Sequence, residues 1–181
     1  HVLSRELLIG VTRFFRDSEA FSHLSSHVIP QVVRNNLGSS DCIRVWIAGC
    51  STGEEAYSIA MLILDEMSRQ DANCQLKIFA TDVDEDAIAF ASAGIYSSDI
   101  DKDISPERLA NYFVKNGDFY TVTQDLRRAV IFSTHNMQDD PPFSSIDLVS
   151  CRNVLIYFQQ AAQKKVLSSL YFALRDKGFL F

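Results

Sequence analysis

Hydrophobic residues are arranged in two patterns along the chain. A spacing of three to four positions predicts helices, and short apolar segments predict buried strands. Between residues 17 and 33 hydrophobic residues recur every three to four positions, which is typical of an amphipathic helix. Asp17 or Ser18 suits its N-terminus, because a short polar side chain accepts hydrogen bonds from the free backbone N–H groups there. The apolar face consists of Phe21, Leu24, Val28 and Val32. The polar run from Asn35 to Asp41 then ends the helix.

After this break, short, mainly apolar segments alternate with amphipathic ones. Residues 43–48 and 76–81 predict buried strands, while residues 54–67 and 85–93 predict helices, the second of them ended by Gly94. Two successive strand–helix units are the signature of a parallel sheet with helices on its faces. The first half of the chain therefore predicts an α/β fold.

The second half of the chain predicts a small antiparallel segment, here called the antiparallel excursion, and the remaining strands of the parallel sheet. A helix is predicted from Pro106 to Val114 with Ser105 as its N-cap, and a Gly117-Asp118 turn then leads into the alternating residues 119–122. Three more core strands are predicted at 129–133, 146–150 and 179–181, with a long amphipathic helix at 159–174.

Both ends of the sequence suggest an excerpt of a longer, multidomain protein. The last predicted strand reaches Phe181, so we expect the sheet to continue beyond it. Residues 3–8 resemble the tail of a helix rather than a domain boundary, and His1 is compatible with a remnant of cloning.

Composition and charge favour a globular domain and argue against a membrane-spanning or nucleic-acid-binding protein. The 181 residues are 47% hydrophobic and 22% charged, which fits one globular domain with a full core. No apolar run approaches the roughly 20 residues that cross a bilayer, and no export signal is recognisable, so we expect a soluble, cytoplasmic protein without membrane insertion. A net charge of −6 argues against nucleic acid as the partner, because such affinity comes from Lys and Arg on phosphates.

Cysteine and histidine give little sign of a metal. The four cysteines are scattered without a C-x-x-C pair, which favours reduced thiols. His23 and His27 are four residues apart on the first predicted helix, a spacing that can chelate a metal. No third ligand is evident, so we favour the reading as ordinary helix and predict no metal site.

The first strand–helix junction carries the first chemical signal. Small residues from Ala48 to Gly53 let a ligand lie against the backbone at the carboxyl end of the sheet, where open α/β sheets bind ligands. The glycine pattern is G-x-x-x-G rather than G-x-G-x-x-G, and Glu54 and Glu55 stand where a pyrophosphate would bind, so a dinucleotide is disfavoured. A carboxylate there suits a ligand with a cationic amino group. The simpler alternative is that these acids bind no ligand and only stabilise the N-terminus of the helix through their negative charge.

A second acid follows the second strand. Asp82 lies at the same predicted edge of the sheet, where a carboxylate accepts hydrogen bonds from both hydroxyls of a ribose. The alternative is an N-cap for the following helix, a role that Asp84 can fill instead. We favour the ribose.

Together these features resemble class I S-adenosylmethionine-dependent methyltransferases, which have a Rossmann-like parallel sheet with helices on both faces. Six motifs narrow the resemblance to CheR-type chemotaxis receptor methyltransferases, which methylate protein glutamates, and they occur in the same order over nearly the whole chain. They are TRFFRD from Thr12, AGCSTGEEAYSIAM from Ala48, FATDVDEDAI from Phe79, AGIY from Ala93, HNM from His135 and SCRNVLIYF from Ser150. LLIGVTRFFRD together with HNMQDDPPFSSIDLVSCRN looks most like the methyltransferase segment of CheB/CheR hybrid signalling proteins.

The resemblance implies a domain organisation and a cofactor. Residues 1–36 would form an N-terminal helical segment and linker with the TRFFRD motif. Residues 41–181 would form the S-adenosylmethionine-binding domain, with a small β subdomain at about 113–129. S-adenosylmethionine would be the cofactor and S-adenosylhomocysteine the product.

The resemblance also implies a site, carried over position by position. The threonine and arginine of the first motif contact the cofactor, the second glutamate of GEE binds it, the aspartate after the second strand holds the ribose, and two asparagine-led pairs follow the later strands. The corresponding residues here are Thr12, Arg16, Glu55, Asp82, Asn136, Met137, Asn153 and Val154, beside Ala48 and Gly49.

The implied reaction transfers a methyl group to the side-chain carboxylate of a glutamate on a methyl-accepting chemoreceptor or similar signalling protein. We expect Arg16 to orient that carboxylate and Tyr157 to face the methyl group. The structural alternatives are an ion pair of Arg16 with Asp17 or Glu19, and a core position for Tyr157.

Two departures from the family pattern matter. The family often has Asn-Glu-Thr where this chain has Gly10-Val11-Thr12, so one hydrogen bond to the cofactor is in doubt. The stretch from Phe113 to Ala129 lacks the longer glycine-containing loop of members that grip a receptor's C-terminal peptide. We therefore expect binding that is independent of the receptor pentapeptide.

Two other functions stay open. Asn153 and Tyr157 resemble the N-P-P-Y motif of amino-methyltransferases that act on nucleic acid, but the spacing is one residue longer and contains no proline. A non-catalytic module that senses S-adenosylmethionine, or that only scaffolds signalling partners, is the alternative from another class.

Overall fold

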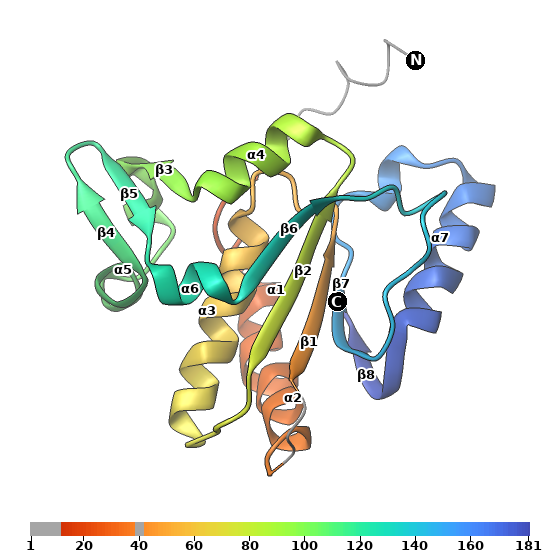
Figure 1. The fold of residues 1–181 in the computed structure, drawn as a ribbon, viewed down its shortest axis with the longest axis horizontal. Coiled ribbons are helices and arrows are strands. Elements are labelled where there is room, and N and C mark those ends of the chain that lie inside the picture. Colours follow the sequence, from red (N-terminus) through yellow and green to blue (C-terminus); the bar gives the residue numbers. More distant parts are fainter. Residues whose placement is uncertain (1–11, 39–41) are drawn as a thin grey trace.

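A five-stranded parallel sheet forms the centre of the computed structural model, which describes residues 12–38 and 42–181. The strand order is β6-β2-β1-β7-β8 (Figure 1). Their bounds are β1 Ile43–Ala48, β2 Leu76–Asp82, β6 Val130–Thr134, β7 Ile146–Ser150 and β8 Leu174–Leu180. The chain moves outward from β1 to β2 and β6, then returns to the other side of β1 for β7 and β8. Strand order therefore reverses between β1 and β7, which is where sheets of this kind bind ligands.

One face of the sheet packs against the N-terminal helices and α3 (Figure 1). The N-terminal segment is helical from α1 (Ser18–His23) through a π-helical turn (Leu24–Val28) into α2 (Ile29–Asn35), and α3 spans Glu54–Arg69. Helix α4 (Glu85–Ala93) contacts β2 and β6. Alternate residues of β1 point to this face, and Ile43, Val45 and Ile47 are fully buried there.

The opposite face is covered by α7 (Gln160–Ala173) and by the connection between β6 and β7. Trp46 points to this side, where it packs with Val166 and Leu170 of α7 in a second core. Residues 135–145 contain no helix, and Phe143 fills the space instead. Its ring stacks on Phe79 at 4.8 Å and meets Trp46 edge-on at 5.1 Å.

A three-stranded antiparallel sheet stands apart from the main sheet, beside α5 (Figure 1). Its order is β3-β5-β4, with β3 at Ile95–Ser97, β4 at Phe113–Asn116 and β5 at Phe119–Val122. A two-residue turn, Gly117-Asp118, joins β4 to β5, because Asn116 pairs with Phe119. Helix α5 spans Pro106–Tyr112, and the short α6 (Gln124–Arg128) leads back into β6.

Most of the predicted elements are confirmed, and four (β1, α4, β5 and β7) match residue for residue. The parallel sheet with helices on both faces and the antiparallel excursion are confirmed as well. No helix among the described residues is long and apolar enough to cross a membrane.

Some predicted bounds are wrong. The helix predicted to reach Val114 ends at Tyr112, because Phe113 leaves the helix and begins β4. The last strand begins at Leu174, five residues before the predicted start, where polar residues and a register shift against β7 hide the strand pattern. The N-terminal helix is interrupted by the π turn just before Pro30, which has no N–H to donate.

Phe14 joins the N-terminal segment to the small sheet, and its replacement tests that contact. The ring is 1% exposed and lies edge-on to Tyr96 at 5.0 Å and to Phe113 at 5.8 Å. We expect Phe14→Ala to lower the free energy of unfolding in urea by about 3 to 5 kcal/mol, since it leaves a cavity. Phe172→Ala is the matched control, because that ring is 76% exposed, and we expect a change within about 0.5 kcal/mol. Equal effects would contradict the role of Phe14.

Candidate active site at the carboxyl edge of the sheet

The loop 49–53 links β1 to α3 at the point where strand order reverses. Gly49 has a φ of 82°, and a Cβ there would lie 3.0 Å from Val154, so only glycine fits against the segment that follows β7. The backbone N–H groups of Gly49 and Cys50 both donate to the carbonyl oxygen of Thr81, at 2.8 and 2.9 Å. The loop is therefore held against β2 and packed against the segment that follows β7, and its backbone lies at the edge of the sheet.

Asp82, at the end of β2, is tied to the same loop. Its carboxylate accepts hydrogen bonds from the N–H of Ser51 at 2.8 Å and of Asp84 at 3.1 Å. Asp84, not Asp82, caps α4, because its side chain accepts from the N–H groups of Asp86 and Ala87. The capping role is thus filled by the neighbour, and the half-buried Asp82 keeps acceptor positions for a ligand.

The two glutamates at the start of α3 differ in their partners. Glu54 turns back to the hydroxyl of Thr52 and is 9% exposed. Glu55 faces the sheet edge, where Ser150 donates to its Oε1 at 2.6 Å and Arg152 to its Oε2 at 3.1 Å. Burial raises the pKa of Glu55 above its usual value, while Ser150, Arg152 and Arg16 lower it.

Arg152 connects this edge to the N-terminal segment. Its Nη2 donates to the carboxylate of Asp17 at 2.6 Å and to the carbonyl oxygen of Arg16 at 3.2 Å. The guanidinium lies over the rings of Phe21 and Phe181, at 5.3 and 4.7 Å from their centroids. Sequence reasoning assigned Arg152 no role. The signal available in the sequence was a cation two residues after a predicted buried strand, at the same edge of the sheet as the predicted acid Glu55.

The segment with Thr12 and Arg16 makes a tight turn before α1. Phe15 and Asp17 both have positive φ values, of 50° and 62°, and the N–H of Phe15 donates to Ser58 of α3 at 3.1 Å. This turn places Arg16 close enough to Glu55 for its charge to lower the Glu55 pKa. Asp17 precedes α1 as predicted, but its carboxylate binds Arg152 instead of the helix N-terminus. Gly10, the departure from the family pattern, lies outside the described residues.

The predicted site residues that follow β6 and β7 lie less close to the glycine loop and the two acids. The side chain of Asn136 bonds within its own turn, to Asp139 and to the N–H of Gln138. Met137 is 8% exposed and packs in the core beneath α7. Asn153 is exposed with a φ of 57°. Tyr157 is 51% exposed on a 3-10 turn (Leu155–Tyr157), so its side chain is not in the core.

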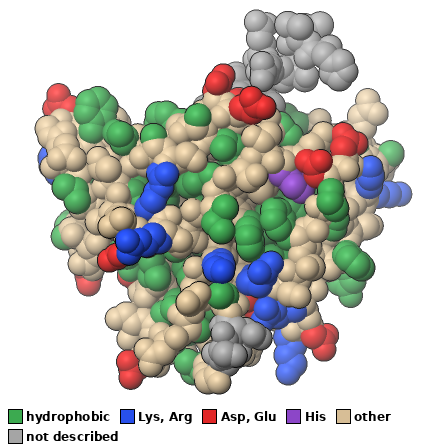
Figure 2. Space-filling model, viewed as in Figure 1, with side chains coloured by type: hydrophobic (Ala, Val, Ile, Leu, Met, Phe, Trp, Pro, Cys, Tyr) green, Lys and Arg blue, Asp and Glu red, His purple; other side chains and the backbone are tan. Residues whose placement is uncertain are grey.

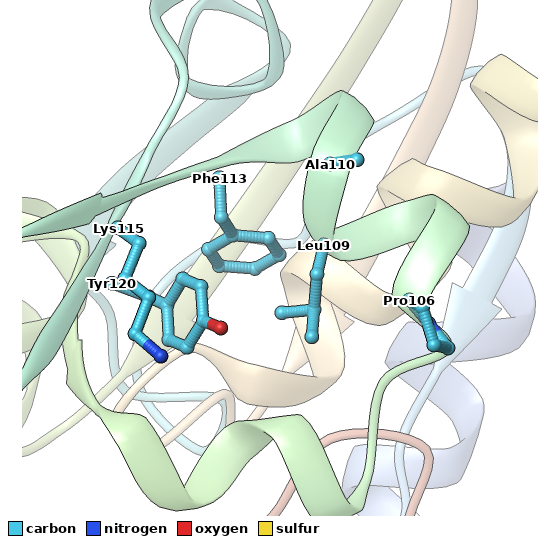
Figure 3. Close-up of a pocket in the computed structure, with 6 residues that line it drawn as sticks. All are labelled: Pro106, Leu109, Ala110, Phe113, Lys115 and Tyr120. Carbon is cyan, nitrogen blue, oxygen red and sulfur yellow. The ribbon is translucent and has the colours of Figure 1, made fainter.

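The structure thus brings Gly49, Glu55, Asp82 and Val154 to one edge, with Arg16 beside them. Ala48 is buried, so only its backbone can face a ligand. A separate hollow of about 300 Å³ lies on the small sheet, outside this edge (Figure 3). Its lining comes from α5, β4 and β5 and consists of Pro106, Leu109, Ala110, Phe113, Lys115 and Tyr120.

Residues 10–181 match the family model described as the CheR methyltransferase, SAM binding domain. The chain belongs to this family. The membership confirms the resemblance drawn from the six motifs, the class I methyltransferase fold and S-adenosylmethionine as the cofactor of the domain.

Relatives from several bacteria align over nearly the whole chain. An uncharacterized 104.1 kDa protein of Rhodobacter capsulatus is 45% identical over 180 residues, which are 99% of this chain and 19% of that protein. A probable chemotaxis protein methyltransferase of Rhizobium etli is 33% identical over 97% of this chain and 66% of its own length. The chemotaxis protein methyltransferase of Borreliella burgdorferi is 34% identical over 93% and 61%. The chain therefore spans about a fifth of the first and up to two thirds of the others.

Solved structures resemble this chain at lower sequence identity. The complex of Rickettsia typhi PKMT2 with AdoHcy has a TM-score of 0.49 and 14% identity, covering 87% of this chain and 23% of that one. The glycopeptide N-methyltransferase MtfA with sinefungin has a TM-score of 0.47 and 14% identity, covering 93% and 53%.

The neighbouring acids Asp82 and Asp84 allow a matched test of the ribose prediction. We expect Asp82→Ala to weaken binding of S-adenosylhomocysteine by about 1.5 to 3 kcal/mol in calorimetry, because the ribose hydroxyls lose a charged acceptor. Asp84→Ala should lower stability by about 1 kcal/mol through loss of the cap and leave the affinity unchanged. Unchanged affinity in Asp82→Ala would show that the carboxylate has no part in binding.

Proposed function

We propose that this chain is the S-adenosylmethionine-binding part of an enzyme that O-methylates glutamate side chains on methyl-accepting chemoreceptors or similar signalling proteins. The observation that carries the proposal is the joint position of Glu55 and Asp82 beside the glycine loop where strand order reverses. Family membership and the chemotaxis methyltransferases among the relatives support the substrate class. The match to a 104.1 kDa protein supports a place within a longer multidomain chain.

The residues at this edge fit the cofactor. Each oxygen of Asp82 accepts one backbone N–H, which leaves lone pairs for the two ribose hydroxyls. Glu55 likewise has one described partner on each oxygen and can accept a further bond from a cationic amino group. The loop of residues 49–53 presents its backbone beside both acids. Thr12, Asn136, Met137, Asn153 and Val154 remain proposed contacts.

The proposed reaction needs positioning more than proton transfer. When bound, S-adenosylmethionine supplies an electrophilic methyl group on a sulfonium. A substrate glutamate with a pKa of about 4.3 is ionised near pH 7, so it attacks without a general base. The protein must then hold the attacking oxygen in line with the methyl carbon, at roughly 3 to 3.5 Å, and exclude water. We assign Arg16 to the non-attacking oxygen and Tyr157 to the angle of approach.

Methyl transfer is the decisive experiment. The chain is incubated with methyl-labelled cofactor and a methyl-accepting receptor fragment, and the label on the receptor is tested for release by mild base, as expected of a glutamyl methyl ester. Base-stable label would indicate an amine or other acceptor. Tight binding of S-adenosylhomocysteine without transfer, also in the presence of the flanking parts of the protein, would favour the sensing or scaffolding module.

Arg16→Lys tests the orienting role. Lysine keeps the charge but loses the planar fork, so turnover should fall at least about tenfold, equivalent to roughly 1.4 kcal/mol of barrier. Affinity for S-adenosylhomocysteine is measured beside the rate, and it should fall less than turnover. Equal losses would assign Arg16 to cofactor binding alone, and a lower melting temperature without a kinetic defect would assign it to structure.

We also propose that receptor recognition is independent of the C-terminal pentapeptide. The two-residue turn between β4 and β5 supports this, because it leaves no long glycine-containing loop. Titration of the pentapeptide should give no detectable binding, and a methyl-accepting fragment without it should be methylated as fast as the intact receptor. Micromolar pentapeptide binding would contradict the proposal.

A further inference from the structure

The amino edge of the main sheet, opposite the cofactor edge, has a polar hollow of about 440 Å³. It is lined by Cys42, Arg44, Ser144, Ser145 and Arg175, which include two arginines and two serines. Lys77 pairs with Arg44 in the register of β1 and β2, which adds a third cation to the same row. Lys and Arg side chains are grouped in the lower middle of the molecular face, next to hydrophobic ones (Figure 2).

The two arginines differ in how far their charges are compensated. Arg175 donates to the buried Asp147 at 3.1 Å, to Asn36 at 3.4 Å and to the carbonyl oxygen of Ser145 at 3.1 Å. The Arg44 backbone N–H donates to the same Asp147 carboxylate at 2.8 Å, but its guanidinium forms no ion pair with a described residue. Its Nε is buried without a hydrogen-bond partner, and its guanidinium lies over the Phe79 ring at 4.9 Å.

An unpartnered buried donor costs free energy unless a ligand satisfies it. The cation–π contact with Phe79 restrains the Arg44 side chain, which reduces the entropy lost when it binds an oxyanion. Two arginines share the single carboxylate of Asp147, and with the two lining serines they supply donors of the kind that bind phosphate.

We propose that this hollow binds the phosphoryl group of a small phosphorylated molecule. Its volume is within the range of small-molecule sites, which is larger than a bare anion requires. Arg44 is the second residue of β1, whereas the loop of the cofactor edge begins after Ala48. The two sites therefore lie at opposite ends of one strand, roughly 13 Å apart at about 3.3 Å per residue, and can be occupied together.

Calorimetric titration of the chain with inorganic phosphate, against chloride at the same ionic strength, tests this proposal. We expect one phosphate per chain, with the same affinity in the absence and presence of saturating S-adenosylhomocysteine. Arg44→Gln should raise the Kd at least about tenfold, because it removes the charged fork. Arg128→Gln is the matched control, since Arg128 is an exposed arginine on α6, and should leave the Kd unchanged.

Ser144→Glu is a second variant, at an exposed position, that places a negative charge in the hollow and should abolish binding even if Arg44→Gln fails to fold. Adenosine monophosphate is titrated in parallel: tighter binding than phosphate indicates an organic phosphate, and equal binding indicates phosphate itself. Absence of phosphate binding, an unchanged Kd in Ser144→Glu, or displacement of phosphate by S-adenosylhomocysteine would overturn the proposal. None of these outcomes depends on methyl transfer, so the proposal can fail while the proposed function holds.

Discussion

The contact of Arg152 with Glu55 holds the carboxyl edge of the sheet together. Both side chains are largely buried, 11% and 18% exposed, and the 3.1 Å ion pair between them offsets part of the cost of burying them. Loss of Arg152 would leave Glu55 buried without its cation, a situation that costs about 3 to 5 kcal/mol in buried pairs. The same guanidinium binds Asp17, so one side chain links the turn before α1, the start of α3 and the end of β7.

The energy of this arrangement comes mainly from the contact with Glu55. Asp17 is 56% exposed, and an ion pair with so exposed a partner contributes little to stability. What Asp17 contributes is position: it directs the backbone before α1 toward Arg152, and Phe14 and Phe15 anchor that backbone to the small sheet and to α3. The proposed orienting residue, Arg16, lies between these anchors and is placed by them.

The sequence predicted the elements whose residues alone determine them. Strands β1 and β7 are mainly apolar runs, interrupted only by Arg44 in β1 and by Asp147 and the final Ser150 in β7. Helix α4 has a cap at Asp84 and a stop at Gly94, so the bounds of all three elements could be read directly. Strand β3, with three residues, and α6, with five, are too short to show a period, and both depend on neighbours that pack against them. The order of the main sheet likewise depends on contacts between distant segments.

The same contrast, between residues that local sequence identifies and residues that depend on distant contacts, applies to the candidate site. Asp82 and Glu55 could be predicted because each directly follows a recognisable strand or loop, whereas Arg152 becomes meaningful only when β7 is placed next to β1.

Burial also determines which groups near the edge can titrate. It raises the pKa of Tyr57 and of Cys151 to about 12 and that of Cys50 further, so all three are neutral near pH 7. None of them is suited to remove a proton or to act as a nucleophile at that pH. The side chains described around the glycine loop are mainly carboxylates and guanidinium groups, which bind and orient. In the proposed reaction the substrate is an ionised carboxylate, which arrives already deprotonated and so needs only to be bound and oriented.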